Sequence, residues 1–366
     1  MYGDIVEIAQ NTLLIEGKRP STIMKEPDIA NSVVYKADDV LYLLDTGATP
    51  FFRERILKAI DSLKPFQKII LFNSHSHPDH VGNNSIINEI KVDKKEHYIS
   101  QAGIIGLDTE KDFYRKFKNI EKYYDYLDGP TNFPATLLRF SKIIRILGED
   151  IPLDILLKNT LLKFMPLEPS KDTALPLEKI NPIKLLIGNT DWTGWNFEDH
   201  VYVMEARGHS PDEVVFYLPK VKVLFLADET FEFFNCWPDS SSLKVKDVIH
   251  KSIKLFQNKE AEILISGHTH VMLKGNDAVK FLNSLLKDYE EFTKQVLQII
   301  KNFPKGITVN KIYKELKNTD TNSAIKKYLS IEFPKMPPFL KTVITSVLLE
   351  EGFRVKGRMR KKKFIP

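Results

Sequence analysis

The chain has 366 residues, of which 43% are hydrophobic and 28% charged, a composition typical of a globular protein with two or three folding units. No apolar run is long enough for a transmembrane helix, and the single cysteine, Cys236, excludes an intrachain disulfide and a cysteine-rich metal site. The N-terminus lacks the basic and then apolar segments of a signal peptide, so we expect a cytoplasmic protein without membrane contact.

The net charge of +5 is concentrated at the C-terminus. Residues 354–363 carry seven cations and no acid, so the remainder of the chain has a net charge of −2 (5 − 7). This distribution indicates a basic tail on a nearly neutral body, and not a basic protein as a whole.

The first hundred residues predict strands joined by tight turns. β-rich runs at 31–35 and 40–44 predict a hairpin. Helical spacing over 50–63 is followed by a short apolar strand over 68–72. This strand leads directly into a histidine-rich loop. Catalytic and binding residues usually lie on such loops, which a rigid scaffold holds in place.

Residues 101–182 predict a helical insertion. Apolar residues at helical spacing and intervening prolines predict helices at 110–127, 134–147 and 152–165. The aromatic content of the insertion suits either an apolar wall over a site or packing within the insertion itself. We also place Trp192, Trp195 and Phe197 beside the approach to the site.

Strand patterns return after the insertion and alternate with helical ones. The expected elements are strands at 201–206, 214–218, 221–226 and 262–266, and helices at 245–257 and 277–302. Pro304-Lys305-Gly306 marks a boundary. Beyond it, helices near 309–316 and 338–350 and a basic hairpin about Gly357 resemble a winged-helix module. Such a module dimerises, completes a pocket or binds nucleic acid; a solvated basic end is the alternative.

Four side chains of metal-ligand type fall within the run His75-Ser76-His77-Pro78-Asp79-His80. Alternate residues of an extended loop project to one side, so His75 and His77 can share one ion. Pro78 favours a turn that directs Asp79 and His80 toward a second ion. The sequence therefore predicts a metal site at this loop.

Three further residues each follow a predicted strand, namely His209, Asp228 and His268. His270 is an alternative to His268 as a ligand, or a substrate contact. The other histidines belong to no motif, and we expect them to be ordinary core or surface residues: His97, His200 and His250.

The run at 75–80, followed by His209, Asp228 and His268, with Asp45 before Gly47 upstream, resembles the motif set of the metallo-β-lactamase superfamily. The resemblance covers about residues 1–100 and 196–275. It implies an α/β fold, the αββα sandwich, with metals at one edge between the two sheets. We accordingly assign 1–100 and 183–302 to the catalytic domain, 101–182 to the helical insertion as a cover of the site, and 303–366 to the winged-helix-like module.

The resemblance also implies the role of each site residue. His75, His77 and His209 would hold one metal, whereas Asp79, His80 and His268 would hold a second. Asp228 would bridge the two metals. Asp45 would orient a metal-binding histidine. Asp79 would also accept a proton during the reaction.

Two cations that share a water lower its pKa from 15.7 toward roughly 7, which permits hydrolysis at neutral pH. The sequence thus predicts a hydrolase with two divalent metal ions. We expect zinc, with iron or manganese as alternatives, and a small, partly apolar ester, lactone, thioester or sulfate ester as substrate. A homodimer is compatible with the C-terminal module.

Two alternative functions remain open at this point. A phosphodiesterase or ribonuclease would use the basic tail to bind nucleic acid, although the nearly neutral body disfavours it. A single-iron thiol or persulfide dioxygenase would use a subset of the ligands. The iron-site oxidoreductases of this superfamily that reduce dioxygen typically have Glu in place of the second histidine, and His77 at that position favours hydrolysis.

Overall fold

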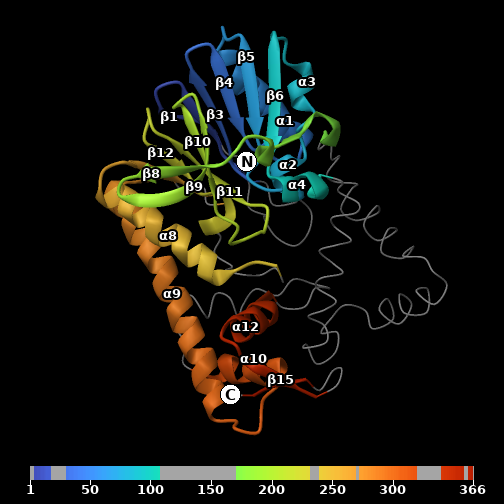
Figure 1. Ribbon diagram of the computed structural model, residues 1–366, viewed down its shortest axis with the longest axis vertical. Helices are drawn as coiled ribbons and strands as arrows, with labels where there is room; N and C mark the ends of the chain where they lie inside the picture. Colours follow the sequence, from blue (N-terminus) through green and yellow to red (C-terminus); the bar gives the residue numbers. More distant parts are fainter. Residues whose placement is uncertain are drawn as a thin grey trace, which may run out of the picture.

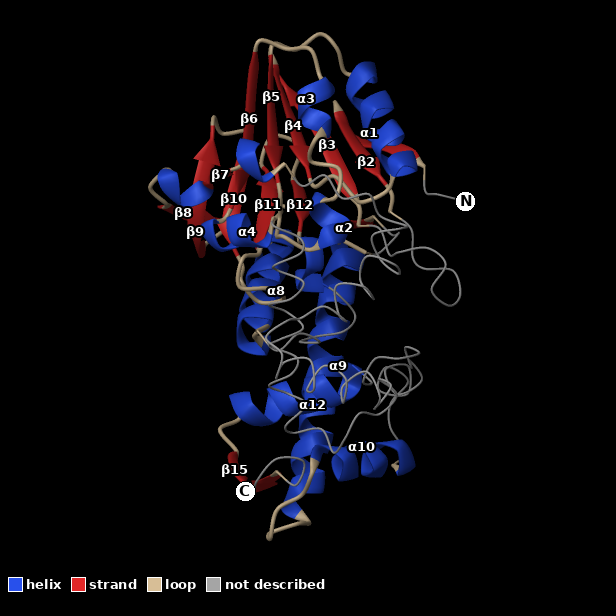
Figure 2. Ribbon diagram, turned by 90° about the vertical axis from the view of Figure 1, so that its right-hand side faces the viewer, coloured by secondary structure: helices blue, strands red, loops and turns tan. Residues whose placement is uncertain are grey.

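The computed structural model describes residues 4–17, 30–107, 170–230, 239–268, 272–319, 339–357 and 362–365. Two seven-stranded sheets form the main body, with helices on the outer face of each sheet (Figures 1 and 2). The αββα sandwich expected from the sequence is therefore confirmed. From this body the long helix α9 (Gly275–Lys301) extends to the C-terminal elements (Figure 1).

The first sheet has its strands in sequence order, antiparallel from β1 to β4 and parallel from β4 to β7. Its central strands are β-branched or aliphatic and buried on both faces, as a sheet covered on both sides requires. The strands are β1 (Ile5–Ala9), β2 (Thr12–Ile15), β3 (Ser32–Ala37), β4 (Val40–Leu44), β5 (Lys68–Phe72), β6 (Lys94–Ile99) and β7 (Leu175–Pro176).

The second sheet is antiparallel except for one parallel pair, β12 with β13. Helix α8 (Ser242–Gln257) connects these two strands and packs on the outer face of the sheet together with α9. The strands are β8 (Ile183–Ile187), β9 (Thr190–Phe197), β10 (Val201–Glu205), β11 (Val214–Leu218), β12 (Val223–Phe225), β13 (Ile263–Ile265) and β14 (Leu273–Lys274).

The strand β9 corrects one expectation, because its aromatic side chains belong to the core. Trp195 and Phe197 lie in the layer between the sheets, where the Phe197 ring meets Phe72 edge-on at 4.6 Å. Trp192 points to the opposite face and packs in the layer under α8. Alternation along a strand separates the two tryptophans in this way. Neither tryptophan borders the approach to a site, since both are buried.

The outer face of the first sheet is covered by α1 (Pro50–Ser62), which buries Phe52, Ile56 and Ile60. The helix begins as its sequence predicts: Thr49 caps it by accepting a hydrogen bond from the Phe52 N–H, and Pro50 occupies the first turn. Three short helices follow near the same sheet: α2 (Pro78–Val81), α3 (Ile86–Glu89) and α4 (Gln101–Gly106).

The C-terminal elements pack against the distal half of α9, where Val296 and Ile300 join one continuous apolar core with Ile312, Val347 and Phe364. The predicted helices and basic hairpin are confirmed as elements, and the division of the chain into domains stays a prediction. These elements are α10 (Val309–Asn318), α12 (Phe339–Glu350), β15 (Arg354–Lys356) and β16 (Lys363–Ile365).

Only the two ends of the expected insertion fall within the described residues. Its beginning is helical, in α4, but its last part contains β7, which pairs in parallel with β6 and so extends the first sheet. Leu177, just after β7, is fully buried between the sheets, which explains why this stretch joins the sandwich. The helices predicted at 110–127, 134–147 and 152–165 lie outside the described residues, as does Cys236. Within the described part of the chain, no helix has the length and apolar character needed to cross a membrane.

Candidate metal centre

The predicted ligands meet at one edge of the sandwich because the strands that precede them end there. Strands β4 and β5 are parallel neighbours, so Asp45 and the histidine run, which follow these strands, lie side by side. In the second sheet β12 and β13 are parallel neighbours, and they bring Asp228 and His268 together. His209 follows β10 in the same sheet.

The ligand atoms form two groups, each with its nitrogen and oxygen atoms within 4.8 Å of one another. The first cluster comprises His75, His77, His209 and Asp228, and the second comprises Asp79, His80 and His268. All seven side chains are buried except that of Asp79, which is 20% exposed. The structure thus brings together all the residues that the sequence assigned to metals, in the same two groups.

The carboxylate of Asp228 lies between the two clusters. Its Oδ2 atom is 3.8 Å from His75 Nε2 and 3.5 Å from His209 Nε2. The same oxygen is 3.3 Å from His268 Nε2, while Oδ1 is 3.3 Å from His80 Nε2. Asp228 therefore contacts histidines of both clusters at once, which is the position a bridging ligand needs.

Asp45 is fully buried and lies next to His80 of the second cluster. Its Oδ1 atom accepts a hydrogen bond from the Ser74 N–H at 2.8 Å, and its Oδ2 atom accepts one from the Ser74 hydroxyl at 2.7 Å. Oδ2 also lies 2.8 Å from His80 Nδ1. A carboxylate in this place makes Nδ1 the proton-bearing nitrogen of His80 and leaves Nε2 to face the cluster.

The charges of the site depend on one another. Burial raises the pKa of Asp228, but His268 and His80 outweigh it and hold the pKa of this carboxyl well below its usual range. The pKa of Asp79 is likewise lowered, against burial, by His80 and His268. Burial lowers the pKa of His80, yet Asp228 and Asp45 raise it, with a net result of about 10. The carboxylates of Asp79 and Asp228 and the imidazole of His80 therefore favour one another's charged forms.

The donor set fits two divalent cations. Imidazole nitrogens and carboxylate oxygens are the ligands of zinc and of several other first-row metals. His80 Nε2 and Asp228 Oδ1 are buried, and neither makes a well-directed hydrogen bond to another residue that the structure describes. Buried polar atoms in this condition cost free energy unless an ion or ligand satisfies them. The two His/Asp clusters thus indicate a binuclear metal site.

Three buried acids that the sequence reading did not assign support the ligand loops. Asp212 Oδ2 accepts a hydrogen bond from the Ser76 N–H at 2.8 Å, within the histidine run. Glu213 and Glu229 are hydrogen-bonded to the backbone of Asp228 and of His209, respectively. The one sequence signal for Glu213 is an acid directly before the apolar strand β11, where a buried charge requires a partner.

Close packing at Gly267 also belongs to the site. A Cβ at this position would lie 2.2 Å from Asp228 Oδ1 and 3.0 Å from the backbone carbon of Ala227. The absence of a side chain at Gly267 therefore allows β13 to approach Asp228, and any other residue would displace the carboxylate.

The remaining histidines are arranged as follows. His97 is buried and its Nε2 donates to Asn73 Oδ1 at 2.7 Å, His200 pairs with Asp38, and the exposed His250 contacts the Lys246 carbonyl. As expected, none of the three joins the clusters. His270, the alternative to His268, lies outside the described residues.

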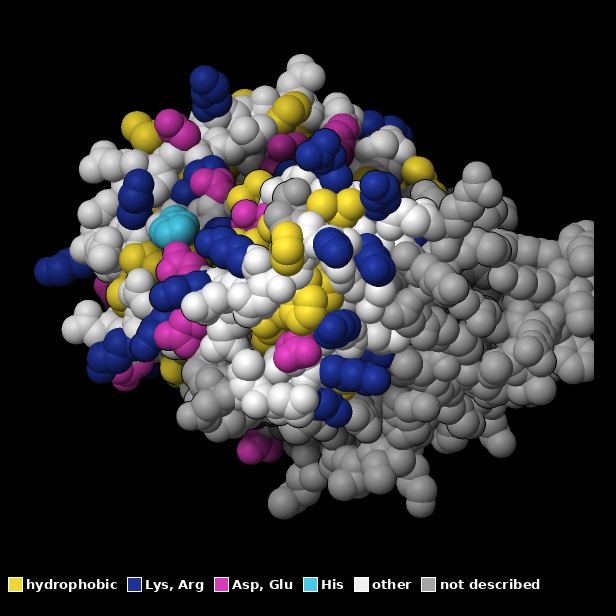
Figure 3. All heavy atoms as spheres, turned by 90° about the horizontal axis from the view of Figure 1, so that it is seen from below, with side chains coloured by type: hydrophobic (Ala, Val, Ile, Leu, Met, Phe, Trp, Pro, Cys, Tyr) yellow, Lys and Arg dark blue, Asp and Glu magenta, His cyan; other side chains and the backbone are white. Residues whose placement is uncertain are grey.

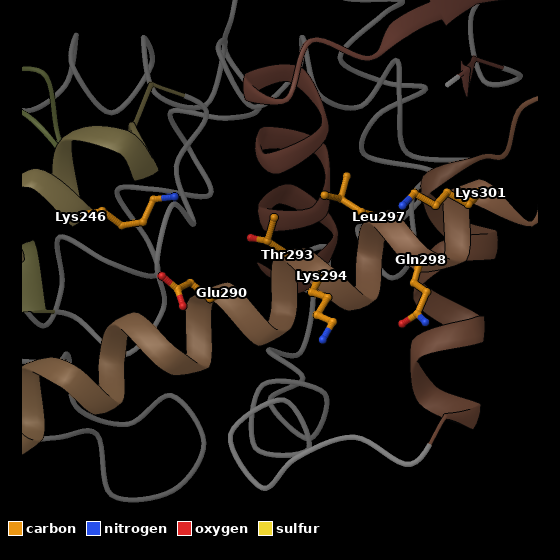
Figure 4. Close-up of a pocket in the computed structure, with 7 residues that line it drawn as sticks. All are labelled: Lys246, Glu290, Thr293, Lys294, Leu297, Gln298 and Lys301. Atoms are coloured by element: carbon orange, nitrogen blue, oxygen red, sulfur yellow. The ribbon is translucent and has the colours of Figure 1, made fainter.

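A separate hollow of about 370 Å³ lies along α9 and holds none of the cluster residues. Figure 4 shows that its polar side chains do not converge: Lys246, Glu290 and Thr293 lie on one side of α9, and Lys294 points to the other. The metal clusters are therefore the stronger candidate for an active site.

Comparison with known proteins agrees with this geometry. The model of the metallo-beta-lactamase superfamily matches residues 26–268, a span that contains both clusters. A metallo-beta-lactamase family protein from Thermus thermophilus is similar in structure, with a TM-score of 0.59 at 15% identity over 98% of this chain and 99% of that one. A beta-lactamase domain protein from Burkholderia ambifaria has a TM-score of 0.56 at 11% identity, covering 99% and 93%.

A stereoselective inverting sec-alkylsulfatase from Pseudomonas sp. also shares the fold, with a TM-score of 0.51 at 13% identity. The match covers 95% of this chain but 50% of the sulfatase. No curated protein matches the chain by sequence. The family match over residues 26–268 and the two His/Asp clusters together show that this chain, with the site of a metal-dependent hydrolase, belongs to the metallo-beta-lactamase superfamily.

Proposed function

We propose that the protein hydrolyses a small, partly apolar ester, lactone, thioester or sulfate ester at a centre of two divalent cations. The observation that carries the proposal is the position of Asp228, whose carboxylate lies within 3.8 Å of histidines from both clusters. A centre of two cations that share a carboxylate suits hydrolysis better than a single-iron oxygenation site, which needs only one cluster.

In this proposal His75, His77 and His209 hold the first cation, Asp79, His80 and His268 hold the second, and Asp228 contacts both. Bound cations would supply an activated water and polarise the bond to be broken. We expect zinc in both sites, because imidazole and carboxylate ligands suit it, with iron or manganese as alternatives.

The residues themselves have separate tasks in the reaction. Asp79 is the most exposed member of the two clusters, at 20%, and its carboxylate lies 3.1 Å from His268 Nε2. This exposure supports a role for Asp79 in accepting the proton that the attacking water would release. Asp45 lies within hydrogen-bond distance of His80 Nδ1, which supports Nε2 as the His80 atom that would bind the second cation.

The substrate class follows from charge and from the fold relatives. The body of the chain is nearly neutral, which suits a small substrate better than a polyanion. One structure of the same fold belongs to a sec-alkylsulfatase, so sulfate esters are included among the candidates.

A screen of metal-reconstituted protein against lactone, thioester, aryl-sulfate, secondary alkyl-sulfate and phosphodiester substrates tests the proposal. We expect turnover of a substrate from one of the first four classes, with two metal ions per chain by elemental analysis. Activity on the phosphodiester alone would overturn the choice of substrate class, and one iron per chain would favour the dioxygenase instead.

Alanine variants make the test specific to the site. His77→Ala and Asp228→Ala each remove a ligand and should abolish metal loading and turnover. His250→Ala serves as the matched control, because this exposed histidine belongs to neither cluster and hydrogen-bonds the Lys246 carbonyl of its own helix. Full activity of either ligand variant would refute the assignment.

Nucleic-acid hydrolysis is the second candidate, favoured by the basic hairpin. Seen from the C-terminal end in Figure 3, Lys and Arg side chains lie around an apolar area, with Asp and Glu among them. Deleting residues 354–366 is not a clean test, because Phe364 is fully buried and its backbone pairs with Ile307. Substituting the exposed Arg354, Lys356 and Lys363 by Gln removes charge and keeps the hairpin. Salt-dependent RNA binding that these substitutions abolish would support this candidate.

A further inference from the structure

Two buried glutamates, Glu213 and Glu229, lie behind the metal clusters without belonging to either. Glu213 is four residues beyond His209 and immediately precedes β11. Glu229 directly follows Asp228, in a short 3-10 helix over Ala227–Thr230. Each glutamate therefore comes from a loop that carries one predicted ligand.

The hydrogen bonds of the two glutamates cross between these loops. Glu213 Oε1 accepts a hydrogen bond from the Asp228 N–H at 2.8 Å. In the other direction, Glu229 Oε1 accepts from the Gly208 N–H at 2.6 Å and from the His209 N–H at 3.1 Å. Each loop thus supplies the acceptor that holds the ligand residue of the other loop.

The packing around Gly208 leaves little room for the Glu229 carboxylate to move. A Cβ on Gly208 would lie 2.3 Å from Glu229 Oε2 and 2.7 Å from the backbone nitrogen of Val245 in α8. The Gly208 carbonyl oxygen also accepts a hydrogen bond from the Ser241 N–H at 2.7 Å. The Glu229 carboxylate consequently occupies space that a side chain at position 208 would fill.

The arrangement costs folding free energy. Glu213 and Glu229 are at most 1% exposed, and their carboxyl groups lie near each other and near the Asp228 carboxylate. Apart from each other's carboxyl group, the Oε2 atoms of both glutamates have no hydrogen-bond donor among the described residues. Apolar side chains would suit such a buried place better for stability alone, so the two acids point to a role in the adjacent site.

We infer that Glu213 and Glu229 are positioning residues that hold the Asp228 and His209 loops together through hydrogen bonds and so set the geometry of the metal ligands. The inference rests on the proposed two-cation centre. It predicts an asymmetry: Glu229 holds the backbone of His209, a ligand of the first cation only, whereas Glu213 holds Asp228, which contacts both clusters.

The test is titration of the metal-free full-length protein with Zn²⁺ in competition with a chromophoric chelator, which resolves the two affinities. Glu229→Ala should weaken one Zn²⁺ site by about 10- to 100-fold and leave the other unchanged. Glu213→Ala should weaken both sites by a similar factor. The visible absorption of the Co²⁺-loaded protein should change in both variants, because it reports ligand geometry.

Glutamine variants separate positioning from charge. An amide oxygen accepts the same backbone hydrogen bonds, so Glu213→Gln and Glu229→Gln should keep both affinities within about threefold. Losses as large as those of the alanine variants would overturn the inference, because charge and not the hydrogen bond would then be required. Glu205→Ala, which removes an acid paired with Arg207 just before the His209 loop, is the control and should change nothing.

Failure of the two proposals is distinguishable. Wild-type protein that does not bind two Zn²⁺ ions would refute the two-cation centre itself. If the wild-type protein has two Zn²⁺ sites and the alanine variants bind Zn²⁺ equally well, only the positioning role of Glu213 and Glu229 is refuted. If the alanine variants do not fold, Glu213→Asp and Glu229→Asp withdraw the carboxylate by one methylene, and the same asymmetric losses are expected of them.

Discussion

Gly267→Ala is a sharp perturbation of the site, because it removes no ligand and adds one methyl group. The new Cβ would lie 2.2 Å from Asp228 Oδ1, whereas real Cβ atoms essentially never come within 3.0 Å of a neighbour. One of the two must therefore move by at least 0.8 Å (3.0 − 2.2). The backbone of Gly267 cannot retreat easily: its N–H donates to the Ala227 carbonyl at 2.6 Å, and its carbonyl accepts from the Asn31 N–H at 2.7 Å.

The displacement consequently falls on the Asp228 carboxylate, which contacts both clusters. A misplacement of about 1 Å in an active site can cost on the order of 100-fold in rate. This factor corresponds to about 2.7 kcal/mol of transition-state stabilisation. Overpacking should also lower the free energy of unfolding by about 1–3 kcal/mol.

Two assays check this prediction. Chelator competition measures both metal affinities without any substrate, and kcat/KM on the best substrate of the screen measures catalysis. Gly275→Ala is the matched control, since its Cβ meets nothing within 4 Å and the strain of its positive φ affects stability away from the clusters. A Gly267→Ala protein with wild-type metal affinity and kcat/KM within about twofold of wild type would refute the reasoning.

Three further predictions address other parts of the molecule. Asp45→Asn removes the charged acceptor at His80 Nδ1 and should weaken the second metal site by about 10- to 100-fold in a Zn²⁺ titration; unchanged affinity would contradict the role of Asp45. Burial lowers the pKa of His97 to about 3, so the unfolded chain takes up a proton below pH 6.5 that the fold excludes, and stability falls as pH falls toward 3. Chemical denaturation should accordingly show that, between about pH 7 and pH 4.5, the free energy of unfolding falls by about 2–3 kcal/mol less in His97→Gln than in wild type. An equal fall in the two proteins would argue against a neutral buried His97. Substituting Arg354, Lys356 and Lys363 by Gln should leave kcat/KM for a small ester unchanged, and a loss above about threefold would place the hairpin in the substrate site.

Much of the fold could be predicted from local patterns. The strand over 68–72 and the strand over 214–218 have the bounds that their apolar runs predict, and the helix from Pro50 ends within a residue of its expected end. The ligand types and their order were also visible, because each follows a strand and metal chemistry restricts the choice to His and Asp. Local periodicity and ligand chemistry were sufficient for these features.

Other features depended on contacts between distant segments. The burial of Trp192 and Trp195, and the pairing of β7 with β6, follow from how the sheets and helices pack. The crossed hydrogen bonds of Glu213 and Glu229 join loops that adjoin different strands, and no spacing along the chain encodes them. The sequence by itself determined which residues can bind metal, while the tertiary structure decided which acids hold them in place, because sheet pairing and packing alone bring those loops within hydrogen-bond distance.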